Sequence, residues 1–307
     1  MALHVILGAG TTGTATARLL ADSGDRVRLV SRRGSGPDHP AIERVAADAG
    51  DTDRLTELAR GADTLVNCAM PPYDRWPELW PPLAASVLTA AERTGAGYVM
   101  LGNLYGYGPV DGPFTEDLPM RPTTAKGGVR AKMWEDALAA HEAGRARVTE
   151  VRASDFVGAG AGSLFNFLVT ASVLAGEPAV YPGSVAVPHA WSYTGDVARA
   201  LAAAALDDRS WGRAWHVPSA SEASVREVAV RLAEVTDSPA PRVEAMTDDE
   251  FSAFAAENPF LAEVAEMLYL YDRPCRVDST DAERILGLKP TSLDDALTEM
   301  AGAPLSV

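Results

Sequence analysis

Three glycines near the start of the chain stand at a spacing suited to binding phosphate groups. The segment Gly8-Ala9-Gly10-Thr11-Thr12-Gly13 follows the pattern G-x-G-x-x-G. Glycines at these positions permit a tight turn and let backbone N–H groups approach a pyrophosphate, whose charge the dipole of a following helix stabilises. The pattern predicts dinucleotide contacts from Gly8, Gly10, Thr11, Thr12 and Gly13, with a plain strand-to-helix turn as the alternative.

The residues that distinguish NAD from NADP are expected about 20 residues further on, at the end of the second strand. There the chain reads Ser31-Arg32-Arg33, where an NAD-binding protein usually places an acidic residue on the ribose 2′-hydroxyl. Two guanidinium groups and a hydroxyl suit a 2′-phosphate, because arginine offers charge and bidentate hydrogen bonds. The segment favours NADP(H) over NAD(H), unless the arginines are simply solvated on a loop.

Tyrosine and asparagine side chains follow the strands expected at residues 64–68 and 98–101. Tyr73 comes after the first strand, and Asn103, Tyr105 and Tyr107 come after the second. Ligands bind at the carboxyl edge of the sheet in this class of fold, so any of the three phenols could donate a proton there. Asn103 could hold a carbonyl oxygen or cap its loop. Packing or surface placement is the alternative for each tyrosine.

A second group of candidates points to a substrate site. Asp155 follows the strand expected at residues 148–152 and could be a buried carboxyl group. His189, Trp191 and Tyr193 alternate along one segment and predict an aromatic wall for an apolar or ring-shaped substrate, or else packing within a lobe. The five histidines show no paired ligand spacing, so the sequence predicts no metal site.

The elements that must position these residues follow from the apolar pattern. Short aliphatic runs alternate with helical stretches over about the first 155 residues, which predicts βαβ units and a parallel sheet. Strands are expected at residues 3–7, 27–30, around 45, 64–68, 98–101 and 148–152, and helices at 14–23, 53–60, 78–93 and 129–143. Right-handed crossovers then give an α/β fold with a doubly wound parallel sheet of the Rossmann type.

The pattern becomes irregular after residue 152. A loop is expected at 158–162, a helix at 164–175, turns at 178–188, a helix at 197–206 capped by Asp196, a strand at 213–217 and a mostly helical remainder. The sequence therefore predicts two interleaved parts. A dinucleotide-binding Rossmann domain takes residues 1–155 plus about 190–217, and a smaller, mostly helical substrate-binding lobe takes residues 156–189 plus 218–307.

The composition of the 307-residue chain excludes several classes of protein. There are 27 Lys and Arg against 42 Asp and Glu, giving a net charge of −15, the wrong sign for a protein whose partner is a nucleic acid. Two cysteines, Cys68 and Cys275, suggest no disulfide framework. We expect no membrane span, since no apolar run approaches about 20 residues, and we expect a cytoplasmic protein because no signal peptide precedes the glycines.

Several further motifs occur in an order typical of one family. They are Asp48-Ala49-Gly50-Asp51, Leu65-Val66-Asn67-Cys68-Ala69, Tyr107-Gly108, Glu116, Pro122, the Lys132/Glu135 pair, Arg152-Ala153-Ser154, Trp191 to Val197, and Arg284-Ile285-Leu286-Gly287. With this set the chain resembles, over nearly its whole length, the extended or atypical short-chain dehydrogenases/reductases of the NAD-dependent epimerase/dehydratase-like group.

The resemblance implies roles for matched residues. Asp48 and Ala49 would contact the adenine, and Ala69 would lie beside the cofactor. Ala153 and Ser154 would pass near the nicotinamide. The helices at 78–93 and 129–143 resemble those that pair family subunits, which makes a homodimer through them plausible.

The chain also departs from the family pattern. The family's tyrosine, four residues before its lysine, falls at Gly128 when the count starts from Lys132, and its serine falls at Asn103. The leading glycine that the family commonly has is replaced by Leu7. Lys132 keeps an implied role in positioning the nicotinamide ribose, because its hydrogen bonds to the ribose do not require the tyrosine.

Three functions fit these observations. The first is an NADP(H)-dependent oxidoreductase that reduces a small organic carbonyl, imine or activated alkene and mainly positions the hydride donor and acceptor. The alternative is a catalytically degenerate NADP-binding redox sensor or regulator, which must bind the two redox states with different affinity. The third is a nucleotide-sugar epimerase or dehydratase, whose usual tyrosine is missing here.

Overall fold

A seven-stranded parallel sheet forms the centre of the molecule. The computed structural model describes residues 1–303. The strands are β1 (Leu3–Leu7), β2 (Arg26–Ser31), β3 (Ile42–Ala46), β4 (Thr64–Asn67), β5 (Gly97–Asn103), β6 (Val148–Ala153) and β10 (Ala214–His216). Their order is β10-β6-β5-β4-β1-β2-β3, and every neighbouring pair is parallel. The predicted Rossmann fold is confirmed, and the strand order reverses between β1 and β4.

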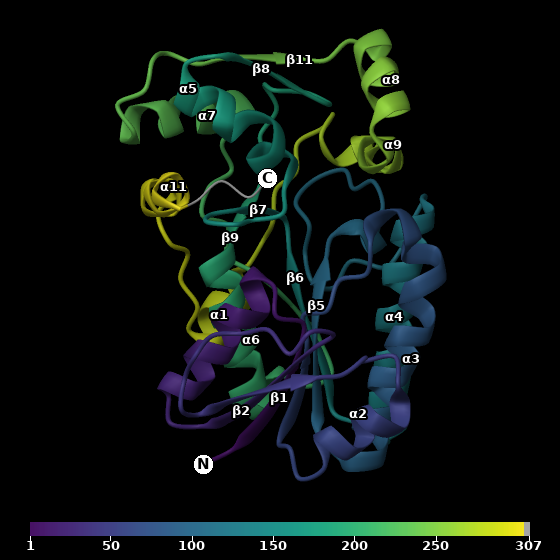
Figure 1. Cartoon of the computed structure of the whole chain (residues 1–307). Coiled ribbons are helices and arrows are strands. Elements are labelled where there is room, and N and C mark those ends of the chain that lie inside the picture. Colours follow the sequence, from purple (N-terminus) through teal and green to yellow (C-terminus); the bar gives the residue numbers. More distant parts are fainter. Residues whose placement is uncertain (304–307) are drawn as a thin grey trace.

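Helices cover both faces of the sheet (Figure 1). One face carries α1 (Thr11–Asp22), α6 (Thr194–Leu206) and α10 (Thr280–Leu286); the other carries α2 (Thr52–Ala59), α3 (Trp76–Thr94) and α4 (Ala125–Glu142). Successive residues of a strand point to opposite faces. Ile6 therefore packs in the cluster that includes α1 and α6, whereas Val5 and Leu7 pack in the cluster that includes α2, α3 and α4.

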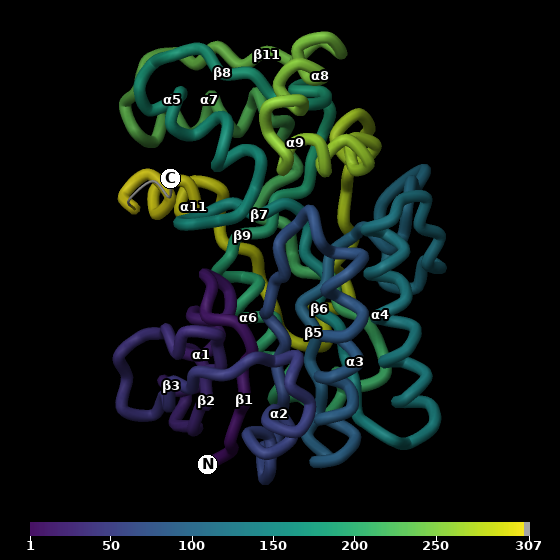
Figure 2. Tube along the Cα trace, turned by 45° about the vertical axis from the view of Figure 1, so that its right-hand side comes forward, coloured from purple at the N-terminus to yellow at the C-terminus, as the bar shows by residue number. Residues whose placement is uncertain are grey.

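A lobe lies above the carboxyl edge of this sheet, as Figures 1 and 2 both show. It contains two small parallel pairs, β7 (Asp155–Val157) with β9 (Trp191–Tyr193) and β8 (Pro178–Tyr181) with β11 (Arg242–Ala245). Its helices are α5 (Ala171–Ala175), α7 (Val225–Val235), α8 (Asp248–Glu257), α9 (Pro259–Val264) and α11 (Leu293–Gly302).

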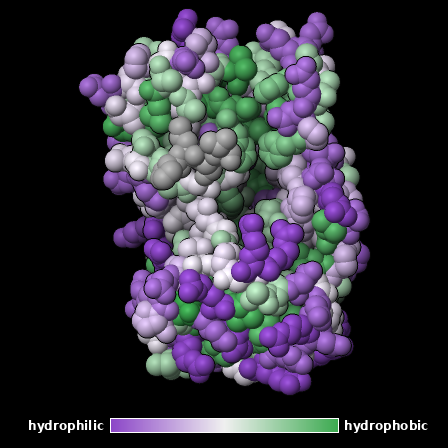
Figure 3. Space-filling view, in the orientation of Figure 1, coloured by the Kyte–Doolittle hydropathy of each residue, from purple (hydrophilic) through white to green (hydrophobic). Residues whose placement is uncertain are grey.

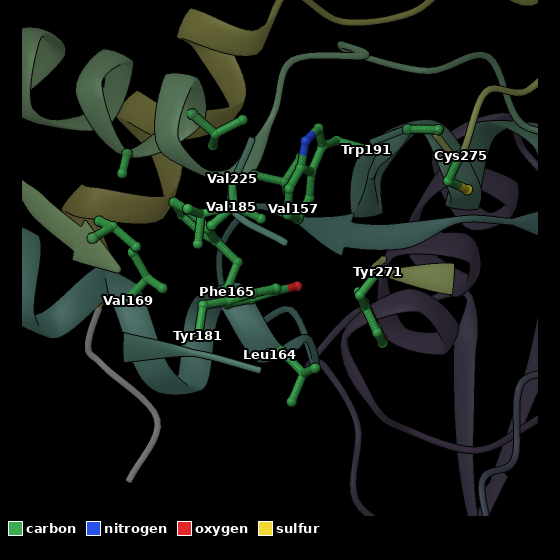
Figure 4. Packing of buried hydrophobic residues seen from close by; sticks show 14 of the residues in the cluster. Val157, Leu164, Phe165, Val169, Tyr181, Val185, Trp191, Val225, Tyr271 and Cys275 are labelled. Carbon is green, nitrogen blue, oxygen red and sulfur yellow. The ribbon is translucent and has the colours of Figure 1, made fainter. Parts of the chain in front are cut away.

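The lobe has a hydrophobic core of its own. Figure 4 shows Phe165, Tyr181 and Trp191 packed among valines of β7, α7 and the neighbouring turns. Trp191 is fully buried and donates its indole N–H to the carbonyl of Ala223 at 2.8 Å. The lobe therefore has a packed interior of its own, separate from the two clusters that flank the sheet.

Three details differ from the sequence expectation. Helix α6 begins at Thr194, and Asp196 lies inside its first turn, so Asp196 is not the cap. Its buried carboxylate instead accepts hydrogen bonds from the backbone N–H and hydroxyl of Thr291, at 2.7 and 2.8 Å. The helix expected at 164–175 contains a π-helical turn at Asn166–Thr170. The third difference concerns residues 218–307, which were expected in the lobe. Within them, α10 packs against α6 and β10, which belong to the sheet half.

Candidate active site

The glycine-rich turn lies where β1 meets the start of α1. Gly8 has φ +94°, and a Cβ on it would lie 2.6 Å from the carbonyl oxygen of Cys68. A Cβ on Gly13 would lie 2.0 Å from the carbonyl oxygen of Gly8. Both glycines are therefore required by the packing of β1, β4 and α1 themselves. Gly10 is different, because a Cβ there would meet open space.

This open side of the turn fits the diphosphate of a dinucleotide. Gly10 is the N-cap of α1 and supplies no side-chain cap to the first N–H groups of the helix. Those groups need an acceptor, and an anion at a helix N-terminus satisfies them. Thr11 is exposed beside the turn, where its hydroxyl donates to the carbonyl of Gly160 at 2.9 Å, so the loop after β7 contacts the first residue of α1.

The residues expected near the adenosine end lie on the surface after β2 and β3. Arg32 and Arg33 are exposed, and neither makes a hydrogen bond or ion pair with any residue of the described range 1–303. Ser31 shares a hydrogen bond with the hydroxyl of Ser35 at 3.2 Å. Asp48 accepts from the backbone N–H of Gly50 at 2.9 Å and forms an exposed turn next to Ala49.

A cavity of about 250 Å³ opens beyond the carboxyl ends of β4, β5 and β6, between the sheet and the lobe. Figure 3 shows the molecule hollowed between its two halves, with hydrophobic side chains around the upper part of the hollow. Seven of the candidate site residues predicted from the sequence line this cavity: Tyr73, Asn103, Tyr105, Ala153, Ser154, Asp155 and His189. Ala69 directly precedes two further lining residues, Met70 and Pro71.

Asp155 and His189 form a pair on the lobe side of the cavity. The Nε2 atom of His189 lies 2.8 Å from Oδ2 of Asp155. The hydroxyl of Tyr271 donates to Oδ1 of the same carboxylate at 3.4 Å, and the rings of His189 and Tyr271 stack with centroids 5.5 Å apart. Both oxygens of the Asp155 carboxylate thus have partners from the lobe, which fixes its orientation at the cavity wall.

Two phenols face this pair from the sheet side. The hydroxyl of Tyr73 donates to the hydroxyl of Tyr105 at 3.4 Å, which leaves the Tyr105 proton available for another acceptor. Burial raises the pKa of Tyr105 to about 12, and burial likewise raises the pKa of Tyr73. Both phenols are therefore protonated at neutral pH and can act as hydrogen-bond donors. Asn103 holds this loop, since its Oδ1 accepts from the backbone N–H of Tyr105 at 3.1 Å.

Comparison with known proteins identifies the family of this chain. A model of the NAD dependent epimerase/dehydratase family matches residues 4–217, well over half of the sequence. The chain belongs to the NAD-dependent epimerase/dehydratase family. The resemblance inferred from the motifs is confirmed, and membership supports a nicotinamide dinucleotide as the cofactor of this family member.

Solved structures with the same fold cover almost the whole chain. The enzyme WbmH of Bordetella bronchiseptica, in complex with NAD+, superposes with a TM-score of 0.77 at 19% identity, covering 98% of this chain and 97% of that one. The UDP-glucuronic acid 4-epimerase of Bacillus cereus gives a TM-score of 0.78 at 16% identity, with 98% of both chains covered. DesIV, a dTDP-glucose 4,6-dehydratase of Streptomyces venezuelae, gives 0.75 at 22% identity, with 98% and 96% covered.

A curated relative matches only a short part of this family member. The shikimate dehydrogenase (NADP(+)) of Haloarcula marismortui is 44% identical over 64 residues, which is 21% of this chain and 24% of that protein. This match is too short to carry that enzyme's activity over.

Four of the nine residues predicted for catalysis or substrate binding do not line the cavity. Lys132 lies on the outer side of α4, with 69% of its side chain exposed, and pairs with Asp136. Tyr107 is 1% exposed and its hydroxyl meets Nε2 of His216 at 2.8 Å. Trp191 belongs to the lobe core, and Tyr193 hydrogen-bonds to Glu299. The structure therefore does not bring the implied ribose lysine, Lys132, to the cofactor crevice.

Two cations that were not predicted as site residues lie on the inner face of α4. Lys126 and Arg130 are 1% and 4% exposed. They stand four residues apart, so they share one side of the helix, and Arg130 lines the cavity. The helix period could have found Arg130, because the apolar positions Met133, Trp134 and Ala137 define an inner face that includes 130 and excludes 132. Lys126 lies on the same face, but the helix was expected to begin at 129, whereas α4 begins at Ala125.

Lys126 is fully neutralised by the lobe. Its ammonium group pairs with Glu263 and with Glu266, the latter at 2.7 Å, and lies 4.7 Å from the centre of the Tyr73 ring. Both glutamates come from the segment around α9. Lys126 thus ties the lobe to α4 at the rim of the cavity.

No helix in the described part of the chain combines the length and the apolar character needed to cross a membrane.

Proposed function

We propose that this chain is an NADP(H)-dependent oxidoreductase that reduces a small organic carbonyl, imine or activated alkene in the cavity above β4, β5 and β6. The observation that carries the proposal is the shared position of two features. The open diphosphate turn at Gly10 and the cavity with Tyr73, Tyr105 and Asp155 lie along one edge of the same sheet. A dinucleotide that begins at the turn would extend toward the cavity.

Bound nicotinamide supplies or accepts the hydride in such a reaction. The chain itself must hold the substrate oxygen or nitrogen and deliver a proton to it. We assign this task to the Tyr105 hydroxyl, whose oxygen accepts from Tyr73 and whose proton is free. The lobe, fixed to α4 by Lys126, covers the cavity from the side opposite the sheet, and Asp155 with His189 lines its wall there.

The preference for NADP(H) is proposed from Arg32 and Arg33. Both guanidinium groups are exposed at the carboxyl end of β2 without partners among the described residues, so a 2′-phosphate can approach them without breaking an existing ion pair. Titration of protein fluorescence with NADPH and NADH at fixed salt tests this. We expect NADPH to bind at least about tenfold more tightly, equivalent to about 1.4 kcal/mol.

A double variant and a control variant test whether the preference comes from these two arginines. Replacing both arginines, Arg32→Ser with Arg33→Ser, should abolish the preference for NADPH. Arg26→Gln, an exposed arginine at the opposite end of β2, should leave the preference unchanged. Equal affinity for the two cofactors in the unmodified chain refutes the assignment. Tight binding of one redox state with no turnover of carbonyl compounds favours the sensor instead.

A nucleotide-sugar epimerase or dehydratase is the second candidate, and the comparisons give it more support than they give a small-carbonyl reductase. Its basis is that proteins named for UDP-glucuronic acid and dTDP-glucose share the fold over 98% of this chain. The cavity, at about 250 Å³, favours a smaller substrate. Calorimetric titration with UDP-glucuronic acid and with UDP-glucose, in the presence of NAD+ or NADP+, distinguishes the two, since binding below millimolar concentration would favour the second candidate.

A further inference from the structure

Arg130 is a buried cation whose environment is aromatic. Its guanidinium carbon lies 4.7 Å from the ring centre of Trp76 and 4.5 Å from that of Trp80, both on α3. Its Nη1 donates to the backbone carbonyl of Leu101, at the carboxyl end of β5, at 3.2 Å. These contacts hold the group in one orientation, and Arg130 is one of the residues that line the cavity.

No carboxylate neutralises this cation. Within residues 1–303, no acidic side chain lies within ion-pair distance of Arg130, and its buried Nε has no hydrogen-bond partner. Glu150, the acidic side chain whose charge acts on it, accepts instead from Nε of Arg152 at 2.6 Å. Burial lowers the pKa of Arg130. A buried charge without a partner is costly, and a ligand anion would remove that cost.

The free edge of the guanidinium has the geometry of a carboxylate receptor. Since Nη1 is taken by Leu101, the Nε and Nη2 atoms remain, and they form the fork that binds two oxygens side by side. The rest of the cavity is apolar at its mouth, where Phe167 and Phe260 meet edge to face at 5.8 Å and Phe167 and Met70 are about half exposed.

We propose that the substrate of the oxidoreductase is an apolar acid whose carboxylate is bound by the Nε/Nη2 edge of Arg130 while its apolar body lies against Phe167 and Phe260. This inference rests on the proposed function and narrows its substrate class. The opposite wall, with the Asp155 carboxylate held by His189, suits the neutral or hydrogen-bonding end of such a molecule.

The test compares two probes of the same shape. Phenylacetate and phenylacetamide differ in charge at the group that would meet Arg130, and Trp76 and Trp80 report binding there by their fluorescence. With the full-length protein saturated with NADPH, we expect phenylacetate to bind at least tenfold more tightly than the amide. Arg130→Gln should reduce that ratio to about one, and Arg130→Lys, which keeps the charge but loses the fork, should give an intermediate ratio.

Arg147 supplies the matched control, because its guanidinium also lies over a tryptophan, Trp211, but it is half exposed and precedes the amino end of β6, whereas the cavity lies beyond the carboxyl end of that strand. Arg147→Gln should leave the ratio unchanged. Phenyl phosphate forms a further arm, and if it alone binds at Arg130 the carboxylate assignment is wrong. Equal affinity for acid and amide in the unmodified protein, or an unchanged ratio in both Arg130 variants, overturns the inference.

Failure of this inference is separable from failure of the proposed function. If Arg130→Gln weakens NADPH binding and leaves the acid-to-amide ratio unchanged, Arg130 serves the cofactor and the inference fails while the oxidoreductase stands. If the unmodified chain binds no nicotinamide dinucleotide, the proposed function fails regardless of the acid-to-amide ratio. The urea midpoint of each variant, measured alongside, identifies any loss that comes from unfolding.

Discussion

His216 makes the stability of this fold depend on pH in a way that can be calculated. The ring is completely buried at the end of β10. Its Nδ1 lies 2.9 Å from the backbone carbonyl of Asp278, which can only accept, so Nδ1 carries the proton and Nε2 accepts from the hydroxyl of Tyr107 at 2.8 Å. Arg152 donates to the same hydroxyl. The neutral ring is therefore fully satisfied, and an added proton would face a buried cation nearby.

Burial is the main cause that lowers the pKa of His216 to about 4, from the usual 6.5. Above pH 6.5 the ring is neutral in both folded and unfolded chains, and the folded state keeps its full stability. Below 6.5 the unfolded chain binds a proton that the folded chain excludes until the pH nears 4. Each unit in this window costs about 1.4 kcal/mol, so His216 removes about 2 kcal/mol of the free energy of unfolding by pH 5.

Urea unfolding at pH 7.5 and pH 5.0 tests this with the variant His216→Gln, which cannot titrate. The variant is less stable at pH 7.5, and we expect its deficit relative to the unmodified protein to shrink by about 2 kcal/mol at pH 5.0. Comparing the two proteins cancels the other titrating groups. Thr149→Val is the control, since it removes a buried, non-titrating hydrogen bond from the adjacent β6 and its deficit should not change with pH. A His216→Gln deficit that is the same at both pH values refutes the reasoning.

Three more predictions concern the site. Gly13→Ala should weaken NADPH binding at least tenfold in a fluorescence titration, because its Cβ would lie 2.0 Å from the Gly8 carbonyl and force the turn open. Tyr105→Phe should lower kcat about 10²-fold at unchanged NADPH affinity if its hydroxyl delivers the proton; an unaltered kcat would move that role elsewhere. Lys126→Gln should lower the free energy of unfolding by about 2 kcal/mol by urea titration, whereas Lys132→Gln, at an exposed pair, should change it by less than about 0.5 kcal/mol; equal effects would contradict the buried tether.

The sheet could be predicted from the sequence because its signals are local. Parallel strands buried on both faces read as continuous apolar runs, and the expected strands at 3–7 and 64–68 agree with β1 and β4 to within one residue. The start of α6 could not be predicted this way. Asp196 has the chemistry of a cap, but its acceptor atoms are used by Thr291, which lies 95 residues away in the sequence.

The candidate site residues likewise include some that the sequence could place and some that it could not. Tyr73, Tyr105 and Asp155 reach the cavity because each follows a strand whose carboxyl end borders it, a rule of the fold that sequence order alone can apply. Trp191 and Tyr193 lie in a lobe without such a rule, so their alternation could not separate a cavity wall from a core. Trp191 proves to be core.

Helix α4 shows that residue type and spacing do not predict the environment of a side chain unless the face of the helix on which it lies is also known. Lys126, Arg130 and Lys132 lie within seven residues, yet each cation has a different environment. Lys132 points outward to Asp136, and Lys126 is neutralised by glutamates from the lobe. Arg130 alone of the three is buried without a carboxylate among the described residues, so it is the one whose charge is left for a ligand. The lobe thereby affects in two ways which ligand charge the cavity favours. It supplies the glutamates that neutralise Lys126, and its described residues supply no carboxylate to Arg130, which lines the cavity.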